Sequence, residues 1–286
     1  MEIPAIYPAM IIPAPPHRAW LKWLSIILVG LFLVIGIFTV IFYFGSDEHA
    51  GVKVIRMEGT LSTGDFSSGD SVGSEYVGNQ LRQAADDPTI NAIVLRVDSP
   101  GGTPAAAEEI ISDMEYAKTK KPVVISMGDI ATSAAYYVSC HANKIYADPD
   151  TLTGAVGVIW TFTDISGWLN QEGYNITDVK SGAFKDMGTT SRALTPGEKN
   201  YAQLIVNESF NRFINDVTTQ RMIARSDIDD GRVIRGTDAL NLNLVDNLGN
   251  LNDAIAGAQQ LAQERETKTP VIHPFSFFSR ATAGNT

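Results

Sequence analysis

The 286-residue sequence contains a single cysteine, only four histidines and no stripe of basic residues. The lone Cys140 excludes an internal disulfide and any zinc site built from several cysteines. As a small apolar side chain beside Ser139, it is more typical of a buried core residue than of a catalytic thiol. A formal net charge of −10 argues against a nucleic-acid partner, because phosphate binding needs clustered lysine and arginine. Nucleic-acid binding and thiol chemistry are therefore disfavoured.

One long hydrophobic run stands near the N-terminus. Residues 24–44 carry no charge, and their number matches the roughly 20 residues that a helix needs to cross a bilayer. The run lacks the short apolar core and small-residue exit of a cleaved signal peptide, so we predict an uncleaved single-pass anchor. Arg18 and Lys22 beside its start favour an N-terminus inside the cell, although Lys53 and Arg56 weaken this charge difference. The rest of the chain would then be extracytoplasmic.

After this run the sequence alternates between β-rich and helix-forming stretches. Strands are predicted at residues 51–57, 92–97, 122–127, 144–147 and 157–162, and helices at 76–85, 104–117, 134–142 and 196–222. The longest helix opens with Thr195 as its N-cap and Glu198 three residues later. Such alternation indicates an α/β domain with a largely parallel sheet covered by helices.

Composition and pattern together divide the chain into four parts. We predict an N-terminal tail over residues 1–22, a transmembrane anchor over 23–45, a folded domain over 50–265 and a C-terminal tail over 266–286.

Ser133 is the strongest candidate for a nucleophile. It stands among small residues between an apolar strand and a helix-forming run, where a backbone turning into a helix leaves N–H groups free for an oxyanion. No histidine is a convincing base for it. His17 and His49 flank the hydrophobic run, and His273 lies in the C-terminal tail. His141 follows on the same expected helix, about 12 Å along its axis.

Lysine is the other common base for a serine, and it acts in this way when burial lowers its pKa. Lys185 follows small residues and Phe184, after a strand-like segment at residues 174–179. Lys180 is its competitor. Because most lysines are simply exposed, the residues alone leave the choice open.

Two loops with glycines are further candidates. Gly101 and Gly102 follow a predicted strand and precede a helix, where positive φ angles can expose N–H groups as an oxyanion hole. The plain alternative is a turn without a ligand. A phosphate loop is excluded by the missing Gly-Lys-Ser/Thr ending. The loop at 151–158 is either a turn with a buried strand or an edge that pairs with an extended peptide.

Four segments carry a family resemblance: residues 98–102, 131–137, 151–157 and 180–186. In order and spacing they resemble the signal peptide peptidase A family in its short single-domain form, over residues 52–262. The resemblance implies a membrane-anchored serine endopeptidase with a Ser/Lys dyad, on the α/β fold shared by the Clp protease subunit and the crotonases, a repeated β-β-α superhelix.

The resemblance also implies residue roles. Ser133 matches the nucleophile and Lys185 the general base, and the N–H of Gly101 or, preferably, Gly102 matches the oxyanion hole together with that of Ala134. Three positions are expected at the substrate groove: Ala135, Gly154 and Val156. Where relatives commonly have Gly-Gly, this sequence has alanines at 134 and 135, which would narrow the groove.

The resemblance further implies a homo-oligomeric ring in which neighbouring subunits can supply the serine and the lysine of one site. The implied substrates are remnants of cleaved signal peptides, and no cofactor or metal is required. Asp186 would oppose a neutral Lys185 if it pointed inward, so we predict that it points away or pairs with Arg192. Two other classes remain: a crotonase-like acyl-CoA enzyme, and an inactive scaffold that only binds peptides.

Overall fold

The computed structural model describes residues 23–24, 27–34 and 51–268. Contacts divide the chain into two units, Met1–Ala50 and Gly51–Thr286. The first unit contributes short helical segments at 23–24 and 27–34, and most of the predicted anchor lies outside the described residues, as does nearly all of the C-terminal tail. Among the residues described, no helix has both the length and the apolar character needed to cross a membrane.

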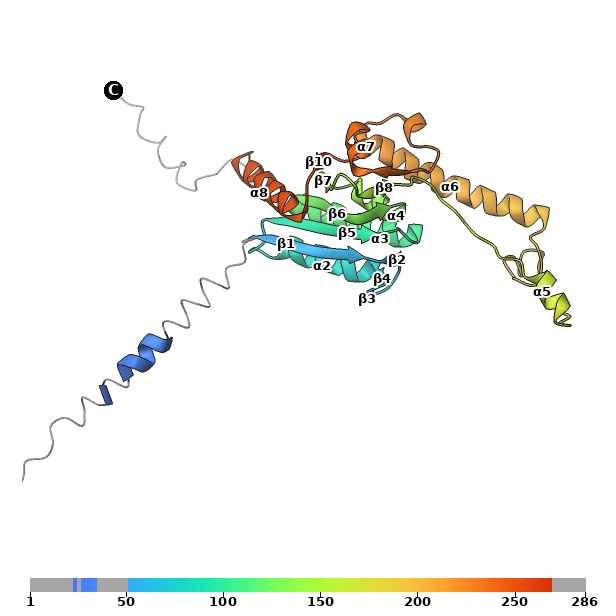
Figure 1. The fold of residues 1–286 in the computed structure, drawn as a ribbon, viewed down its shortest axis with the longest axis horizontal. Helices are drawn as coiled ribbons and strands as arrows, with labels where there is room; N and C mark the ends of the chain where they lie inside the picture. The colour runs from blue at the N-terminus through green and yellow to red at the C-terminus, as the bar shows by residue number, and fades with distance from the viewer. Residues whose placement is uncertain (1–22, 25–26, 35–50, 269–286) are drawn as a thin grey trace, which may run out of the picture. The chain divides into compact units, whose positions relative to one another are not determined.

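A seven-stranded sheet forms the centre of the second unit (Figure 1). Its main path follows the order β1-β5-β6-β7-β10, with β8 beside β6 and β9 beside β8. The strands are β1 (Val52–Glu58), β5 (Ala92–Ser99), β6 (Val123–Thr132), β7 (Lys144–Ala147), β8 (Leu152–Gly154), β9 (Val233–Arg235) and β10 (Asn247–Leu248). Every pair is parallel except β8 with β9. The fold is therefore mixed α/β with a mainly parallel sheet.

Helices cover both faces of this sheet, which explains why its central strands begin with apolar runs, at residues 92–95 of β5 and 123–125 of β6. Ile93 and Leu95 of β5 belong to the larger core cluster, which also contains residues of the helices α2 (Ser74–Asp86), α3 (Pro104–Lys120) and α4 (Ala134–Ser139). Val94 points to the opposite face and packs with α8 (Leu251–Lys268). A second, small sheet completes this part, with β2 (Thr60–Ser62), β3 (Ser67–Ser68) and β4 (Ser71–Gly73).

Between β8 and the long helix α6 (Pro196–Arg221), residues 157–195 extend away from the sheet; we call this segment the arm (Figure 1). The arm contains α5 (Ser166–Gln171) and exposes large apolar side chains, such as Ile159 at 89% and Val179 at 97%. The chain returns along α6 and continues through η1 (Arg225–Asp227) and α7 (Gly236–Asn241) to the sheet.

Several sequence predictions are confirmed, and three need correction. The capping box of Thr195 with Glu198 at the start of α6 is present. The strands predicted at 157–162 and 174–179 do not form, because these residues lie in the arm, where no neighbouring strand pairs with them. The helix predicted at 134–142 ends at Ser139.

Candidate active site

Ser133 occupies a sharp turn between β6 and α4. Its backbone has φ 53° and ψ −124°, a conformation that residues other than glycine rarely adopt. Two hydrogen bonds hold it there: the N–H of Ser133 donates to the carbonyl of Gly154 at 2.9 Å, and the carbonyl of Ser133 accepts from the N–H of Tyr137 at 2.9 Å. The surrounding structure thus imposes a strained backbone on the residue that we predicted as the nucleophile.

The loop with Gly101 and Gly102 packs directly against this turn. Gly101 has φ +103°, and a Cβ atom there would lie 2.9 Å from both the amide nitrogen of Ala134 and the Cβ of Ser133. The N–H of Gly101 donates to the hydroxyl of Ser99, and its carbonyl accepts from the N–H of Leu61. The N–H of Gly102 takes part in neither of these two hydrogen bonds. Only a glycine at 101 permits this close approach.

Ala134 begins α4, so its N–H lies in the first turn, where backbone donors have no partner within the helix. Its amide lies beside Gly101 and next to the serine turn. The sequence-predicted oxyanion residues and Ser133 are therefore brought together by two separate loops.

A cavity of about 600 Å³ opens at Ser133. Its walls are mostly apolar and include Tyr137 of α4, Val156 after β8, and Phe210 and Phe213 of α6. Carboxylates also line it, namely Glu108, Asp229 and Asp230. The wall from α6 was missed from sequence, although the spacing of Val206, Phe210 and Phe213 along one helix face is a signal that could have revealed it.

The three residues predicted to bind substrate, Ala135, Gly154 and Val156, differ in their position relative to the cavity. Val156 lines the cavity. Gly154 serves instead through its carbonyl, which fixes the N–H of Ser133. Ala135 is fully buried in the core and is not part of the cavity wall, so its methyl group does not narrow the cavity directly.

Tyr137, Cys140 and His141, which follow Ser133 along the chain, do not suit proton transfer. Burial and a hydrogen bond to Asp216 raise the pKa of Tyr137. Burial raises the pKa of the Cys140 thiol, and burial lowers that of His141 despite the nearby Glu115. Neither Cys140 nor His141 lines the cavity. The geometry agrees with the exclusion of both from sequence.

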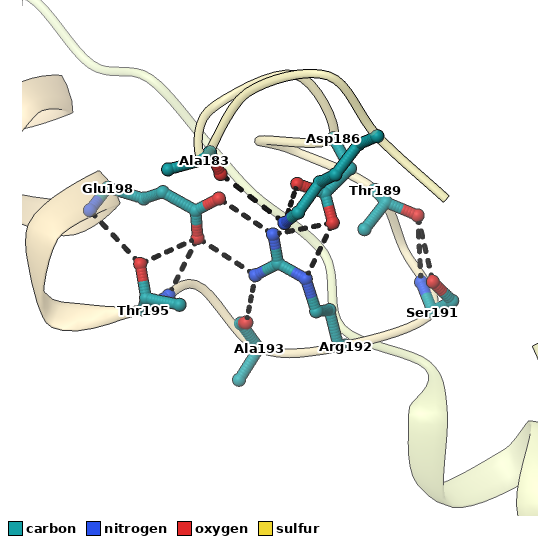
Figure 2. A network of polar contacts seen from close by, with 9 residues as sticks. Ala183, Asp186, Thr189, Ser191, Arg192, Ala193, Thr195 and Glu198 are labelled. Carbon is teal, nitrogen blue, oxygen red and sulfur yellow. Dashed lines mark hydrogen bonds and ion pairs between the residues drawn. The ribbon is translucent and has the colours of Figure 1, made fainter. Parts of the chain in front are cut away.

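Lys185 lies in an exposed turn of the arm, where its N–H donates to the carbonyl of Gly182. The neighbouring Asp186 is paired with Arg192 at 2.9 Å, as we predicted. Figure 2 shows this pair at the start of α6, where Arg192 also contacts Glu198. The competing Lys180 binds Asp186 and is thus committed to the same cluster.

One chain does not bring Lys185 to Ser133. The cluster around Asp186 is tied to Glu198 at the start of α6, whereas Phe213 of the same helix contacts Tyr137 with ring centroids 4.6 Å apart. These two points on α6 are about 22 Å apart at the usual helical rise. Lys185 is also not among the residues that line the cavity at Ser133.

The Glu198 carboxylate gives an acid-sensitive element to this end of α6. Hydrogen bonds from Arg192, then from the backbone of Thr195, lower the pKa of Glu198 to about 2. Because the pKa of Glu198 is lower in the fold than in the unfolded chain, its ionised carboxylate stabilises the fold at pH values above the ordinary pKa of glutamate. This contribution is lost as the pH falls toward 2. We expect the protection factors of amides in the first turns of α6, which correct for the intrinsic slowing of exchange in acid, to fall from pH 5 to pH 2. Glu198→Gln should remove most of this pH dependence; an unchanged dependence would contradict the assignment.

An α/β domain with a serine on a strained strand-to-helix turn, beside backbone N–H donors and above an apolar cavity, is typical of hydrolases that act through a covalent intermediate. The profile of Peptidase family S49 matches residues 115–265. The chain belongs to this peptidase family.

Individual proteases of similar sequence are consistent with this family. Protease 4 of Salmonella typhi is 36% identical over 225 residues, which cover 77% of this chain and 36% of that protein. A putative protease of Methanocaldococcus jannaschii is 32% identical over 69% of this chain and 67% of its own length. The putative signal peptide peptidase SppA of Enterococcus faecium is 34% identical over 62% of this chain and 52% of its own length. The chain spans about a third of the length of the Protease 4 relatives.

Proposed function

We propose that this protein is a serine endopeptidase in which Ser133 is the nucleophile and Lys185 the general base. The observation that carries the proposal is the strained turn at Ser133, which holds the hydroxyl at a cavity beside free backbone donors. Gly102 is the better of the two glycine donors, because the N–H of Gly101 is already bound to Ser99. The N–H of Ala134 is the second donor of the proposed oxyanion hole, beside that of Gly102.

The proposed reaction follows from these roles. A neutral Lys185 accepts the proton of Ser133 as its oxygen attacks a peptide carbonyl, and the lysine then protonates the leaving amine. Backbone donors aimed at the developing oxyanion contribute about 3 kcal/mol each. Water enters after the amine departs, and it hydrolyses the acyl-enzyme to restore Ser133.

The lysine of each site comes from a second copy of the chain. This part of the proposal is supported by the length of α6 that separates the turn of Lys185 from the cavity. It is also supported by the exposed apolar side chains of the arm, including Trp168 and Val179, which an adjacent subunit would cover. A head-to-tail arrangement of this kind forms a ring when the rotation between neighbours closes, and we propose that it does so here.

The proposed substrates are extended apolar peptides, such as remnants of signal peptides. The apolar wall formed by Val156, Phe210 and Phe213 suits such side chains. Carboxylates of Glu108, Asp229 and Asp230 on the same cavity are unfavourable for the phosphates of CoA. We further propose that residues 24–44 anchor the protein in the cell membrane as a single span, with the catalytic domain extracytoplasmic.

A fluorophosphonate probe tests this function directly. The full-length protein should become covalently labelled at Ser133, as peptide mass mapping would show, because an activated serine attacks the phosphorus centre. Labelling should be absent in Ser133→Ala and retained in Ser139→Ala, whose buried hydroxyl bonds only to the carbonyl of Ala135. An unlabelled wild-type protein would overturn the proposal.

A further inference from the structure

The charged cluster at the start of α6 lies beside the proposed base. We propose that Arg192 is a positioning residue for Lys185: it binds the carboxylate of Asp186 and keeps that charge away from the lysine amine that meets Ser133. This inference rests on the proposed function and adds to it a residue that never touches the substrate.

The carboxylate of Asp186 is held from two sides. Its Oδ1 accepts from the Nζ of Lys180 at 2.5 Å, and its Oδ2 accepts from the Nε of Arg192 at 3.1 Å. The side chain of Asp186 is only 12% exposed. Figure 2 shows Asp186 turned toward the guanidinium of Arg192. The acidic neighbour of Lys185 therefore has fixed cationic partners.

Arg192 is itself anchored at the opposite end. Its Nη1 and Nη2 donate to the two carboxylate oxygens of Glu198 at 2.8 and 2.7 Å, a bidentate contact. Glu198 is 2% exposed and closes the capping box with Thr195 at the start of α6. The helix end thus fixes Arg192, and Arg192 fixes Asp186 (Figure 2).

This arrangement balances the charge around Lys185. Two cations and two anions form the cluster: Lys180 and Arg192, with Asp186 and Glu198. The phenol of Tyr201 also approaches from α6, where its ring contacts Phe184 with centroids 5.5 Å apart. A carboxylate released next to a lysine would favour its protonated form, which cannot act as a base. Loss of Arg192 should thus affect Lys185 through the charge of the Asp186 carboxylate as well as through the conformation of the cluster.

The test is the pH dependence of kcat/KM for a fluorogenic apolar peptide, measured on the full-length oligomer. Arg192→Gln should move the acidic limb of the profile upward by about half to one pH unit, a modest shift because the site is partly solvated. Activity should recover at high pH. The double variant Arg192→Gln/Asp186→Asn should return the limb to its wild-type position, since the released charge is then absent.

Further variants separate this effect from loss of structure. Because Arg192→Gln leaves Glu198 buried and unpaired, Arg192→Gln/Glu198→Gln removes that cost and should still show the shift. Arg56→Gln breaks the exposed pair of Arg56 with Glu58 and should leave the profile unchanged. An equal loss of rate at every pH in the single and double variants would overturn the inference. Cleavage that survives Lys185→Ala would overturn the proposed function as well.

Discussion

Replacing Ser133 by alanine is expected to lower kcat/KM for peptide cleavage by at least ~10³-fold without unfolding the protein. The substitution removes the attacking oxygen and leaves both backbone hydrogen bonds of the turn, since these involve only main-chain atoms of residue 133. Alanine carries the same Cβ, so the fit against Gly101 is also preserved. A fluorogenic peptide assay measures the loss, and circular dichroism measures the fold.

Ser139→Ala is the matched control for this prediction. It removes a hydroxyl from the same helix, away from the cavity, and breaks one buried hydrogen bond to the carbonyl of Ala135. We expect a loss of stability of about 1 kcal/mol and little change in kcat/KM. If Ser133→Ala kept activity within tenfold of the wild type, the nucleophile would have to be another residue.

Local features of the fold could be predicted from the sequence. The strand at 144–147 forms as expected, and the start of α6 at Pro196 follows from its N-cap. Both depend on signals within a few residues: an apolar run bounded by turn residues, and a capping box whose two partners are three positions apart.

The arm could not be predicted in this way. The β-branched residues at 174–179 indicated a strand, but a strand needs a neighbour, and in the arm none is available within the chain. The family resemblance already favoured Gly102 over Gly101, but the structural reason, the bond from the N–H of Gly101 to the hydroxyl of Ser99, is a contact that spacing does not reveal. The apolar face of α6 is visible in the sequence, but its place at the cavity depends on the packing of Phe213 on Tyr137, which is distant in sequence.

The placement of Lys185 is the largest gap between sequence and structure. Its motif indicates a base, yet the arm holds it at the N-terminal end of α6, where Arg192 ties the neighbouring Asp186 to Glu198. A motif specifies which residues react, whereas the distance between them depends on how many copies of the chain build one site. This separation predicts that two inactive variants restore activity to each other when they assemble together.

Ser133→Ala and Lys185→Ala should each be inactive alone, and co-expressed in equal amounts they should regain about one quarter of the wild-type activity. In mixed rings, a site is complete when its serine comes from a Lys185→Ala subunit and its lysine from a Ser133→Ala neighbour. Random assembly gives each condition a probability of about one half, so about one quarter of the sites are complete. Fluorophosphonate titration of purified mixed oligomers counts these sites.

The control replaces Lys185→Ala by the double variant Ser133→Ala/Lys185→Ala, which offers no intact serine and should leave the mixture inactive. A second control mixes wild type with the double variant and confirms that subunits assemble together. If those mixed rings form but the complementing pair stays inactive, both residues of a site must come from one chain. The arm would then have to fold back along α6 by about 20 Å, against the fixed pairing of Arg192 with Glu198. Restored activity would instead explain why this chain exposes its apolar arm and keeps its lysine away from its own serine.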